Sequence, residues 1–503
     1  MDIPYLVSNA ESIPHEGEPV SYTRVDSPSY RNASVLIAIA AFSCLVVTLL
    51  QSLVVPAVPH FPSLFDSSTT TVSWTVTATL LAGAITTPIM GRLSDLFSRR
   101  RVMVVTMTLV FVGSVIAPLG DITTIILGRA LQGTGTALIP VAMAEVRHRL
   151  PKNRISSALA LLSTMLGIGG GLGIPIGGVI LAKFGWEAIF WFSAIMSAVS
   201  IILILTVTKR DNSASLGSFD IPGAVLLGLS LISLLTAVSQ GVIWGWGSAI
   251  TLSLFIGGVV LGVIWAKYEL GQTSPLVNLR TMADRPILLT NVASILLGTL
   301  MYSNLLLTTL ELQNPRTEGG FDWPVASAGL AMLPSAAAML AVSPISVRMT
   351  TRYGPRVVVI VGSSIASAGY LLRLSFAPSG AFVVVWATVI AIGVGIGYAG
   401  LPMMIVKYVP AQETGSANAV NVLMRSIGMA VSSAMVAAIT TALAVAANGG
   451  TVPSSGAFDL LAGIGIGMGV VSATLSASAK RRDEQGRGGH HTTLDPVASD
   501  AAR

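Results

Sequence analysis

The residues of this sequence that could do chemistry are the few ionisable side chains that interrupt its apolar segments. Arg129 and Arg425 fall inside such segments, and Glu311 ends one. In apolar surroundings an arginine normally faces a cavity or a partner, and a carboxylate can take part in a proton relay. Asn418, Asn421 and Arg425 have helical spacing, so they share one face of a helix. We expect that face to point into a cavity; the alternative is hydrogen bonding between helices.

Glu311 is the best-placed carboxylate for binding a proton. Very few of the 23 acidic residues lie within apolar segments. A buried positive charge such as Arg129 would bias this site if the fold brought the two together. The alternative for Glu311 is a solvated carboxylate at a helix end. Glu145 is followed by Arg147 and Arg149, which favours an ion pair at a membrane face.

The composition predicts that lipid is the main solvent of these residues. Hydrophobic residues make up 52% of the 503 residues and charged residues only 10%, with a mean hydropathy of +0.77. A soluble chain carries about 25% charged residues, so this chain could not cover a water-facing surface. Cys44 is the single cysteine, which excludes an intramolecular disulfide and a cysteine-based zinc site.

Apolar runs follow one another at short intervals along the chain. Each is close to the roughly 20 residues that a helix needs to cross the hydrocarbon core, and none alternates like a strand of a membrane barrel. The sequence therefore predicts an all-α, polytopic membrane protein with 14 transmembrane helices. The expected spans are 33–57, 70–90, 102–120, 122–145, 155–182, 188–208, 221–240, 249–266, 287–312, 325–346, 357–377, 381–406, 415–443 and 458–479.

Basic residues predict the orientation of these spans. With the N-terminus inside, 24 of the 29 Lys and Arg fall on the cytoplasmic side, and only Lys183 and Arg316 fall in loops on the other side. The positive-inside rule then makes residues 1–32 and 480–503 cytoplasmic tails. This asymmetry explains the net charge of +6 without a nucleic-acid partner, and it predicts an attraction to anionic lipid.

An internal repeat relates two parts of the chain. One set of positions corresponds at a constant offset: Pro151 with Pro410, Ala158 with Ala417, Ala160 with Ala419, and Gly169 with Gly428. A second echo pairs residues 98–100 with residues 354–356. Such repeats are typical of transporters whose site lies between two halves. We predict a six-helix half at 33–208, a two-helix insertion at 209–286 and a second six-helix half at 287–479.

The run at residues 91–101 (Gly-Arg-Leu-Ser-Asp-Leu-Phe-Ser-Arg-Arg-Arg) places Asp95 between a glycine and a basic cluster. Here the sequence resembles the major facilitator superfamily, although Ser98 stands where that family usually has a second glycine. The resemblance implies the major facilitator fold and a conformational gate, whereas the simpler alternative is a basic loop that only sets topology. The gate residues would be Gly91, Asp95, Arg99 and Arg100.

Two further runs carry the resemblance. Residues 127–137 resemble the fourth-span motif of the family, which implies that Arg129 and Gln132 act in proton coupling or in a central cavity. The alternative for Arg129 is interhelical hydrogen bonding. Residues 167–178 resemble the fifth-span antiporter motif, with Pro175 one residue later than in the family pattern; the alternative is a generic packing face. The helix-packing residues implied are Gly173, Pro175, Gly177 and Gly178.

Fourteen spans and these motifs resemble the fourteen-helix drug/proton antiporter branch over residues 33–479. That branch commonly carries an aspartate in span one, nine residues before a proline; counted from Pro59 this position is Leu50, beside Gln51, so the first span has no acid. The resemblance implies a secondary transporter of a bacterial plasma membrane that exports small amphipathic compounds in exchange for protons, with no cofactor and no ATPase subunit. The missing acid leaves metabolite uptake or uniport open.

Other protein classes lack their signatures in this sequence. There is no phosphate-binding loop and no His-Glu-x-x-His zinc motif. The string at 395–400 fits a dinucleotide fingerprint, but it lies inside a long apolar span with no strand before it. A polytopic membrane enzyme would need acids, His or Lys clustered at one membrane face, and a transporter-derived sensor would need a folded soluble domain. We therefore predict no catalytic residue and no metal site.

Overall fold

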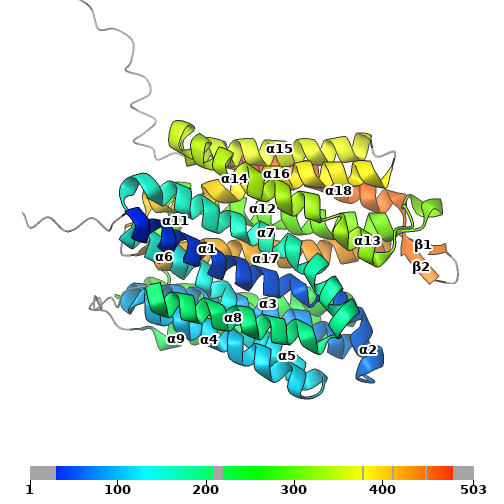
Figure 1. Cartoon of the computed structure of the whole chain (residues 1–503), viewed down its shortest axis with the longest axis horizontal. Coiled ribbons are helices and arrows are strands. Elements are labelled where there is room, and N and C mark those ends of the chain that lie inside the picture. Colours follow the sequence, from blue (N-terminus) through cyan, green and yellow to red (C-terminus); the bar gives the residue numbers. More distant parts are fainter. Residues whose placement is uncertain (1–29, 208–218, 377–378, 411–412, 448–449, 480–503) are drawn as a thin grey trace, which may run out of the picture.

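The computed structural model describes residues 30–207, 219–376, 379–410, 413–447 and 450–479. Its long helices run along the long axis of the molecule (Figure 1). In the described ranges, 14 helices are long and apolar enough to cross a membrane, as the sequence predicts. Almost all of the predicted tails, 1–32 and 480–503, lies outside these ranges.

The helices fall into three consecutive groups along the chain. The first group contains α1 (Tyr30–Leu53), α2 (Phe61–Leu64), α3 (Thr69–Leu96), α4 (Arg99–Ile116), α5 (Ile122–Gly133), α6 (Leu138–Arg149), α7 (Lys152–Phe184) and α8 (Glu187–Val207). The second contains α9 (Ile221–Trp244), α10 (Ala249–Leu270) and α11 (Leu279–Ala283). The third contains α12 (Arg285–Gln313), α13 (Val325–Leu330), α14 (Leu333–Tyr353), α15 (Pro355–Ser375), α16 (Gly380–Tyr408), α17 (Thr414–Ala442) and α18 (Ser455–Ser478).

The fourth predicted span is not one continuous α-helix. It consists of α5, the 3₁₀ turn η3 (Thr134–Ala137) and α6. Glycine and threonine are weak helix formers, and they alternate through this turn. The break also allows a close helix contact, because a Cβ on Gly133 would lie 2.2 Å from the backbone oxygen of Thr79 in α3. The fourth span therefore changes from an α-helix to a 3₁₀ turn where it crosses α3.

The internal repeat corresponds to matching helix pairs. In the first group α7 packs along α1, and in the third α17 packs along α12. Thr48 of α1 donates to the backbone oxygen of Met165 at 3.0 Å, and Thr299 of α12 donates to that of Gly428 at 3.0 Å. The two contacts have the same chemistry because small residues on the packed helix let a threonine hydroxyl reach its backbone.

The sequence correspondence between residues 98–100 and 354–356 also has a structural counterpart. Arg100 donates to the backbone oxygen of Leu205, near the end of α8. Arg356, at the corresponding position, donates to the backbone oxygen of Ser476, near the end of α18. Each arginine thus satisfies a carbonyl of the last helix turn, where orphan acceptors and the negative end of the helix dipole meet.

The first and third groups meet most extensively along two pairs of helices, α3 with α17 and α7 with α14, and also where α7 meets α16 and α6 meets α17. These pairs are related by the same repeat, since α7 and α17 are the corresponding helices. The contact along α7 and α14 is close, because a Cβ on Gly171 would lie 2.9 Å from the Cβ of Ala336. We call the shared surface the seam between the halves.

Of the two long helices in the second group, one packs on the seam. Helix α9 contacts both α3 and α17, whereas α10 packs mainly on α9. The outer side of α10 exposes large apolar side chains, including Phe255 and Ile256, as expected for a surface that faces lipid. Thus α9 belongs to the packed body of the bundle, and α10 lies at its edge.

A short antiparallel hairpin joins α17 to α18, which the sequence did not predict. It is formed by β1 (Ala444–Ala447) and β2 (Gly450–Pro453), with Val445 opposite Val452. Asn314, just after α12, donates to the backbone oxygen of Pro453 at 2.9 Å. The hairpin lies at the same end of the bundle as α2 and α13, while α6 and α11 lie at the other end (Figure 1).

The glycines of the fifth span provide a test of this packing. A Cβ on Gly177 would lie 2.0 Å from the backbone oxygen of Leu53, whereas one on Gly178 would meet nothing within 4 Å. Both changes to alanine improve helix propensity by about 1 kcal/mol. We expect Gly177→Ala to lower the unfolding temperature of the detergent-purified protein because α1 must move. Gly178→Ala, the matched control, should leave it unchanged or raise it; equal effects would contradict the packing.

Candidate functional site

Asp95 binds the beginning of a helix from the opposite half. It lies near the end of α3, and its carboxylate accepts hydrogen bonds from the backbone N–H groups of Gly415 at 3.0 Å and Ser416 at 2.9 Å. These are the first residues of α17, whose N–H groups have no partner within the helix. The positive end of the helix dipole also favours a carboxylate there. The contact therefore joins the two halves across the seam.

Gly91 makes this approach possible. One turn before Asp95, a Cβ on Gly91 would lie 2.5 Å from the Cβ of Ala419. Any larger residue would push α3 away from α17 and lengthen the hydrogen bonds of Asp95. Gly91 and Asp95 therefore both contact α17.

The two arginines predicted for the gate have different surroundings. Arg99 is close enough to interact electrostatically with Asp95 and with Glu145. Arg100 instead donates to Leu205 within its own half. The first partners of Asp95 are therefore backbone N–H groups, with Arg99 as a nearby charge.

Arg147 makes a second contact across the seam at the same end of the bundle. It donates to the hydroxyl of Thr414, to the backbone oxygen of Val406 at 3.2 Å and to that of Val409 at 3.4 Å. Two of these acceptors end α16, and the third begins α17. This end carries the basic segments 92–101 and 147–154, and we call it the basic end. These contacts join the two halves there, beside a groove between α7 and α14.

Two carboxylates at the basic end, those of Glu145 and Glu413, bind side chains from neighbouring segments. Glu145 forms an ion pair with Arg149 one turn later, which confirms the ion pair expected for Glu145 and shows that Arg149 is its partner. Glu413 precedes α17 and accepts from Asn278 at 3.0 Å and Thr281 at 3.1 Å. These two residues belong to the segment between α10 and α12, so the two inserted helices are linked to the helix that Asp95 binds.

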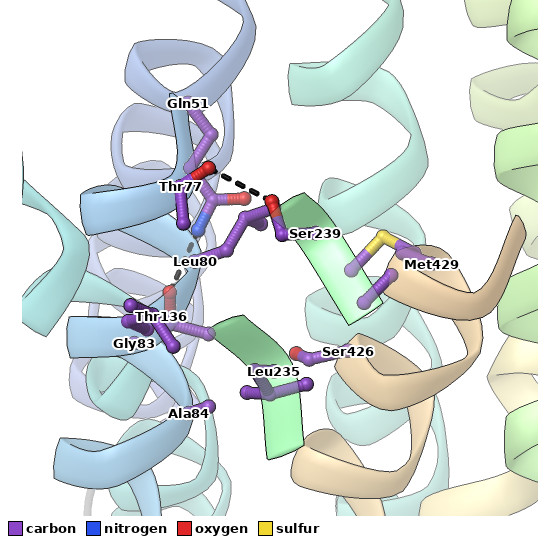
Figure 2. A pocket seen from close by; sticks show the side chains of 12 residues that line it. Gln51, Thr77, Leu80, Gly83, Ala84, Thr136, Leu235, Ser239, Ser426 and Met429 are labelled. Atoms are coloured by element: carbon purple, nitrogen blue, oxygen red, sulfur yellow. Dashed lines mark hydrogen bonds between the residues drawn. The ribbon is translucent and has the colours of Figure 1, made fainter. Parts of the chain in front are cut away.

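A small cavity lies on the seam, between the described helices α1, α3, α9 and α17. Its volume is about 20 Å³, which leaves room for about one water molecule. Figure 2 shows that residues from both halves and from α9 face it. The lining residues are Gln51, Thr77, Leu80, Leu81, Gly83, Ala84, Thr136, Leu235, Ser239, Ser426, Met429 and Ala430.

The polar residues of this cavity bond to one another. The amide of Gln51 donates to the hydroxyl of Thr136 at 2.7 Å, and the hydroxyls of Thr77 and Ser239 lie 2.8 Å apart (Figure 2). Gln51 lies beside the position where the resembling branch carries an acid. The cavity wall is therefore uncharged where that branch places its carboxylate.

Arg129 is buried and fully engaged within the first half. Its guanidinium donates to the backbone oxygens of Leu50 at 3.0 Å, Gln51 at 3.2 Å and Thr75 at 3.2 Å, and to Gln132 at 2.9 Å. Helix α1 ends at Leu53, so the carbonyls of its last turn have no partner within the helix. Arg129 satisfies two of them. This arrangement is the interhelical hydrogen bonding that the sequence left as an alternative.

Glu311 forms a buried ion pair with Arg373 of α15. Arg373 donates to this carboxylate through Nε at 2.9 Å and through Nη2, and its Nη1 donates to Thr308 at 2.8 Å. Glu311 is only 7% exposed, so it is not a solvated helix end. The partners of Arg129 all lie in the first half, so Arg373, and not Arg129, is the arginine that acts on Glu311.

The polar face of α17 packs against two different helices. Asn421 donates to Asn291 at 3.1 Å and to Ser294 at 2.6 Å, both in α12. Arg425 turns to α16, where its guanidinium lies 4.7 Å from the ring centre of Tyr398. The residues are buried rather than exposed to an open cavity, so the group predicted as one site divides into separate contacts.

Two groups of functional candidates were missed from the sequence. Arg373 lies within a span, and an intramembrane arginine calls for a buried partner, so pairing it with Glu311 was an available inference. Ser239 and Leu235 of α9 carried no signal, because the insertion looked like a connector. Only the packing of α9 on the seam places them in the cavity wall.

Comparisons with known proteins agree with this architecture. A tetracenomycin C resistance and export protein of Streptomyces glaucescens is 27% identical over 82% of this chain and 77% of its own length. The multidrug resistance protein Stp of Mycobacterium tuberculosis is 27% identical over 77% of this chain and 72% of its own. The lincomycin resistance protein LmrB of Listeria monocytogenes is 28% identical over 66% and 70%.

A solved structure and a family profile extend the comparison. The human organic anion transporter MFSD10 (TETRAN) superposes with a TM-score of 0.62 at 13% identity, over 88% of this chain and 99% of its own, so the two share a fold. The sequence profile of the Major Facilitator Superfamily matches residues 40–433. With its 14 membrane-spanning helices, two repeat-related halves and a seam between them, the chain belongs to the Major Facilitator Superfamily.

Proposed function

We propose that this protein exports small amphipathic compounds or drugs across a bacterial plasma membrane in exchange for protons. The observation that carries the proposal is the contact of Asp95 with the first turn of α17. This contact joins the two halves at the basic end through hydrogen bonds, which can break when the halves move apart. The names of the relatives, which are resistance and export proteins, support export of a small molecule. Alternating access then requires the halves to rock about the seam.

The orientation belongs to the same proposal. The basic end carries the Arg-rich segments, so we place it and both termini in the cytoplasm. The described conformation is then closed to the cytoplasm. The basic end would open when Asp95 and Arg147 release α17 and α16, and the opposite end would close.

Reporter fusions test this orientation. We expect fusions at Gly217, Thr273 and Gly486 to read cytoplasmic, and fusions at Gly247 and Gly319 to read external. Gly319 has a φ of +77° in a turn after α12, and Thr273 follows α10, so both positions lie outside helices. A cytoplasmic signal at Gly247 would remove the two inserted helices from the membrane, and an external signal at Thr273 would leave only one of them as a span; either result would overturn the fourteen-span arrangement.

A second candidate function is uniport or uptake of a metabolite by the same fold. Leu50 and Gln51 favour it, because neither can bind and release a proton at or beside the position where the resembling branch carries an aspartate. Inverted vesicles that are given a drug panel from the outside separate the two functions. Export by exchange predicts accumulation that disappears when the proton gradient is dissipated. Equilibration that is the same with and without a gradient would establish uniport instead.

A further inference from the structure

Arg425 is a buried cation without a matching anion. Its side chain is 1% exposed, and its Nε and Nη1 have no hydrogen-bond acceptor among the described residues. A buried guanidinium that lacks acceptors is strongly unfavourable. Arg129 shows the contrast, because its guanidinium has four acceptors. Among the buried arginines that the structure describes, Arg129 and Arg373 have acceptors, whereas Arg425 leaves two guanidinium nitrogens without one.

Tyr398 offsets only part of this cost. The guanidinium of Arg425 lies 4.7 Å from its ring centre, and such a cation–π contact offsets part of the desolvation cost of the charge. The hydroxyl of Tyr398 is also buried and without a partner in the described part of the chain. Two guanidinium nitrogens of Arg425 and the hydroxyl of Tyr398 thus lie near each other without hydrogen-bond partners. They are the donors that a carboxylate, phenolate or sulfonate would accept from.

The position of this cluster relates it to the transport path. Arg425 precedes Ser426, and Ser426 and Met429 of the same helix face the cavity on the seam. Its backbone carbonyl packs against α12, where a Cβ on Gly298 would lie 2.4 Å away. The cluster therefore lies among α12, α16 and α17, next to the cavity wall of the second half. When the halves rock apart, this wall is the surface that a substrate meets.

The charges around the cavity favour an anion over a cation. In the described part of the chain, neither Arg425 nor Arg129 forms an ion pair, whereas Arg149 pairs with Glu145 and Arg373 pairs with Glu311. Gln51 is neutral where a carboxylate would attract a cation. Leucines and Met429 supply the apolar part of the cavity wall.

Resting on the proposed transport function, we propose that Arg425 and Tyr398 anchor the substrate and that the transported compounds are amphipathic organic anions. The acidic oxygens of the substrate accept from the Arg425 guanidinium and the Tyr398 hydroxyl. The apolar body of the substrate lies against the leucines and Met429 of the seam. Cationic compounds of the same size and shape bind more weakly, because no carboxylate compensates the charge of Arg425.

Two xanthene dyes of opposite charge test this class. Fluorescein is an anion and rhodamine 123 is a cation on the same ring system. Binding is measured by fluorescence polarisation with the purified full-length protein in a neutral detergent. We expect fluorescein to bind at least about tenfold more tightly than rhodamine 123, and Arg425→Gln to weaken fluorescein binding roughly ten- to a hundredfold. The affinity for rhodamine 123 should stay within about threefold.

Three variants keep the result interpretable. Arg425→Lys retains the charge without the guanidinium fork, so it should lose less fluorescein affinity than Arg425→Gln. Tyr398→Phe should lose a smaller part, since only the hydroxyl is removed. Arg348→Gln changes the net charge by the same amount at an exposed position and should change neither affinity. Each variant is first checked for an unchanged unfolding temperature.

The outcomes separate this inference from the transport function. Equal or tighter binding of rhodamine 123, no binding of fluorescein, or equal losses of both dyes in Arg425→Gln would overturn the substrate class. A protein that keeps the preference for fluorescein but shows no gradient-dependent accumulation in vesicles would retain the binding site and lose the exchange mechanism. Gradient-dependent accumulation of cations that Arg425→Gln does not change would retain the exchange mechanism and overturn the anion-binding site.

Discussion

Asp95→Asn is expected to slow transport by roughly ten- to a hundredfold while expression and substrate affinity stay near those of the unmutated protein. The carboxylate of Asp95 accepts from two backbone N–H groups of α17. Hydrogen bonds to a charged group contribute about 1.5–3 kcal/mol each, and asparagine loses the charge and one acceptor. A contact made in only one access state biases the equilibrium by its differential energy. Losing it shifts the protein away from the conformation closed at the basic end.

Asp121→Asn is the matched control for this prediction. Asp121 also accepts from the first N–H groups of a helix, those of Thr123 at 3.0 Å and Thr124 at 3.2 Å. That helix is α5, in the same half, so the contact does not cross the seam. Asparagine is also a good N-cap, and transport should be unchanged. If Asp95→Asn transports at the normal rate, Asp95 does not form the gate.

Glu311→Gln is expected to uncouple transport from the proton gradient. Substrate would still equilibrate across the membrane, but a gradient would no longer concentrate it, because glutamine cannot take up and release a proton. The prediction follows from the lack of an acid in the first span and from the burial of Glu311 beside Arg373. The measurement is gradient-driven accumulation in inverted vesicles. Full accumulation by Glu311→Gln would move the coupling role to another residue.

The ion pair also has a structural effect that must be separated from coupling. Removing one partner of a buried pair typically destabilises a protein by about 3–5 kcal/mol, so Glu311→Gln alone is expected to lower the unfolding temperature. The double variant Glu311→Gln with Arg373→Gln removes the unpaired charge and should recover part of that stability. If the double variant also recovers accumulation, the pair is structural only, and the coupling prediction is wrong.

The fold was largely predictable because it depends on local patterns. Long apolar runs and the distribution of arginine predict fourteen spans, and the offset between Gly169 and Gly428 predicts two related halves. The hairpin at β1 and β2 was not predictable in this way, since its short strands carry no long periodic pattern. The break at η3 could not be placed either, because it follows from the contact of Gly133 with α3.

The site was predictable only where one motif contains its own partners. Glu145 and Arg149 lie one turn apart, so their spacing predicts their pairing. Asp95 was expected to act in a conformational gate, and which helix it binds depends on the packing of the two halves. The sequence grouped three residues that interrupt or end apolar spans: Arg129, Glu311 and Arg425. Each contacts a different helix, α1, α15 and α16 respectively, and these partners could be identified only from the packing of the helices.

The rocking of the halves with the Asp95 contact as its gate is tested most directly by distance measurements between spin labels. Asn153 of α7 and Thr351 of α14 are exposed and line one groove at the basic end, and replacing Cys44 removes the only native thiol. Val35 and Asn153, both in the first half, form the control pair. We expect the distance from Asn153 to Thr351 to have a short population, and Asp95→Asn to shift it to a longer one while the control distance stays fixed. A single, unchanged distance in both proteins would contradict the gate.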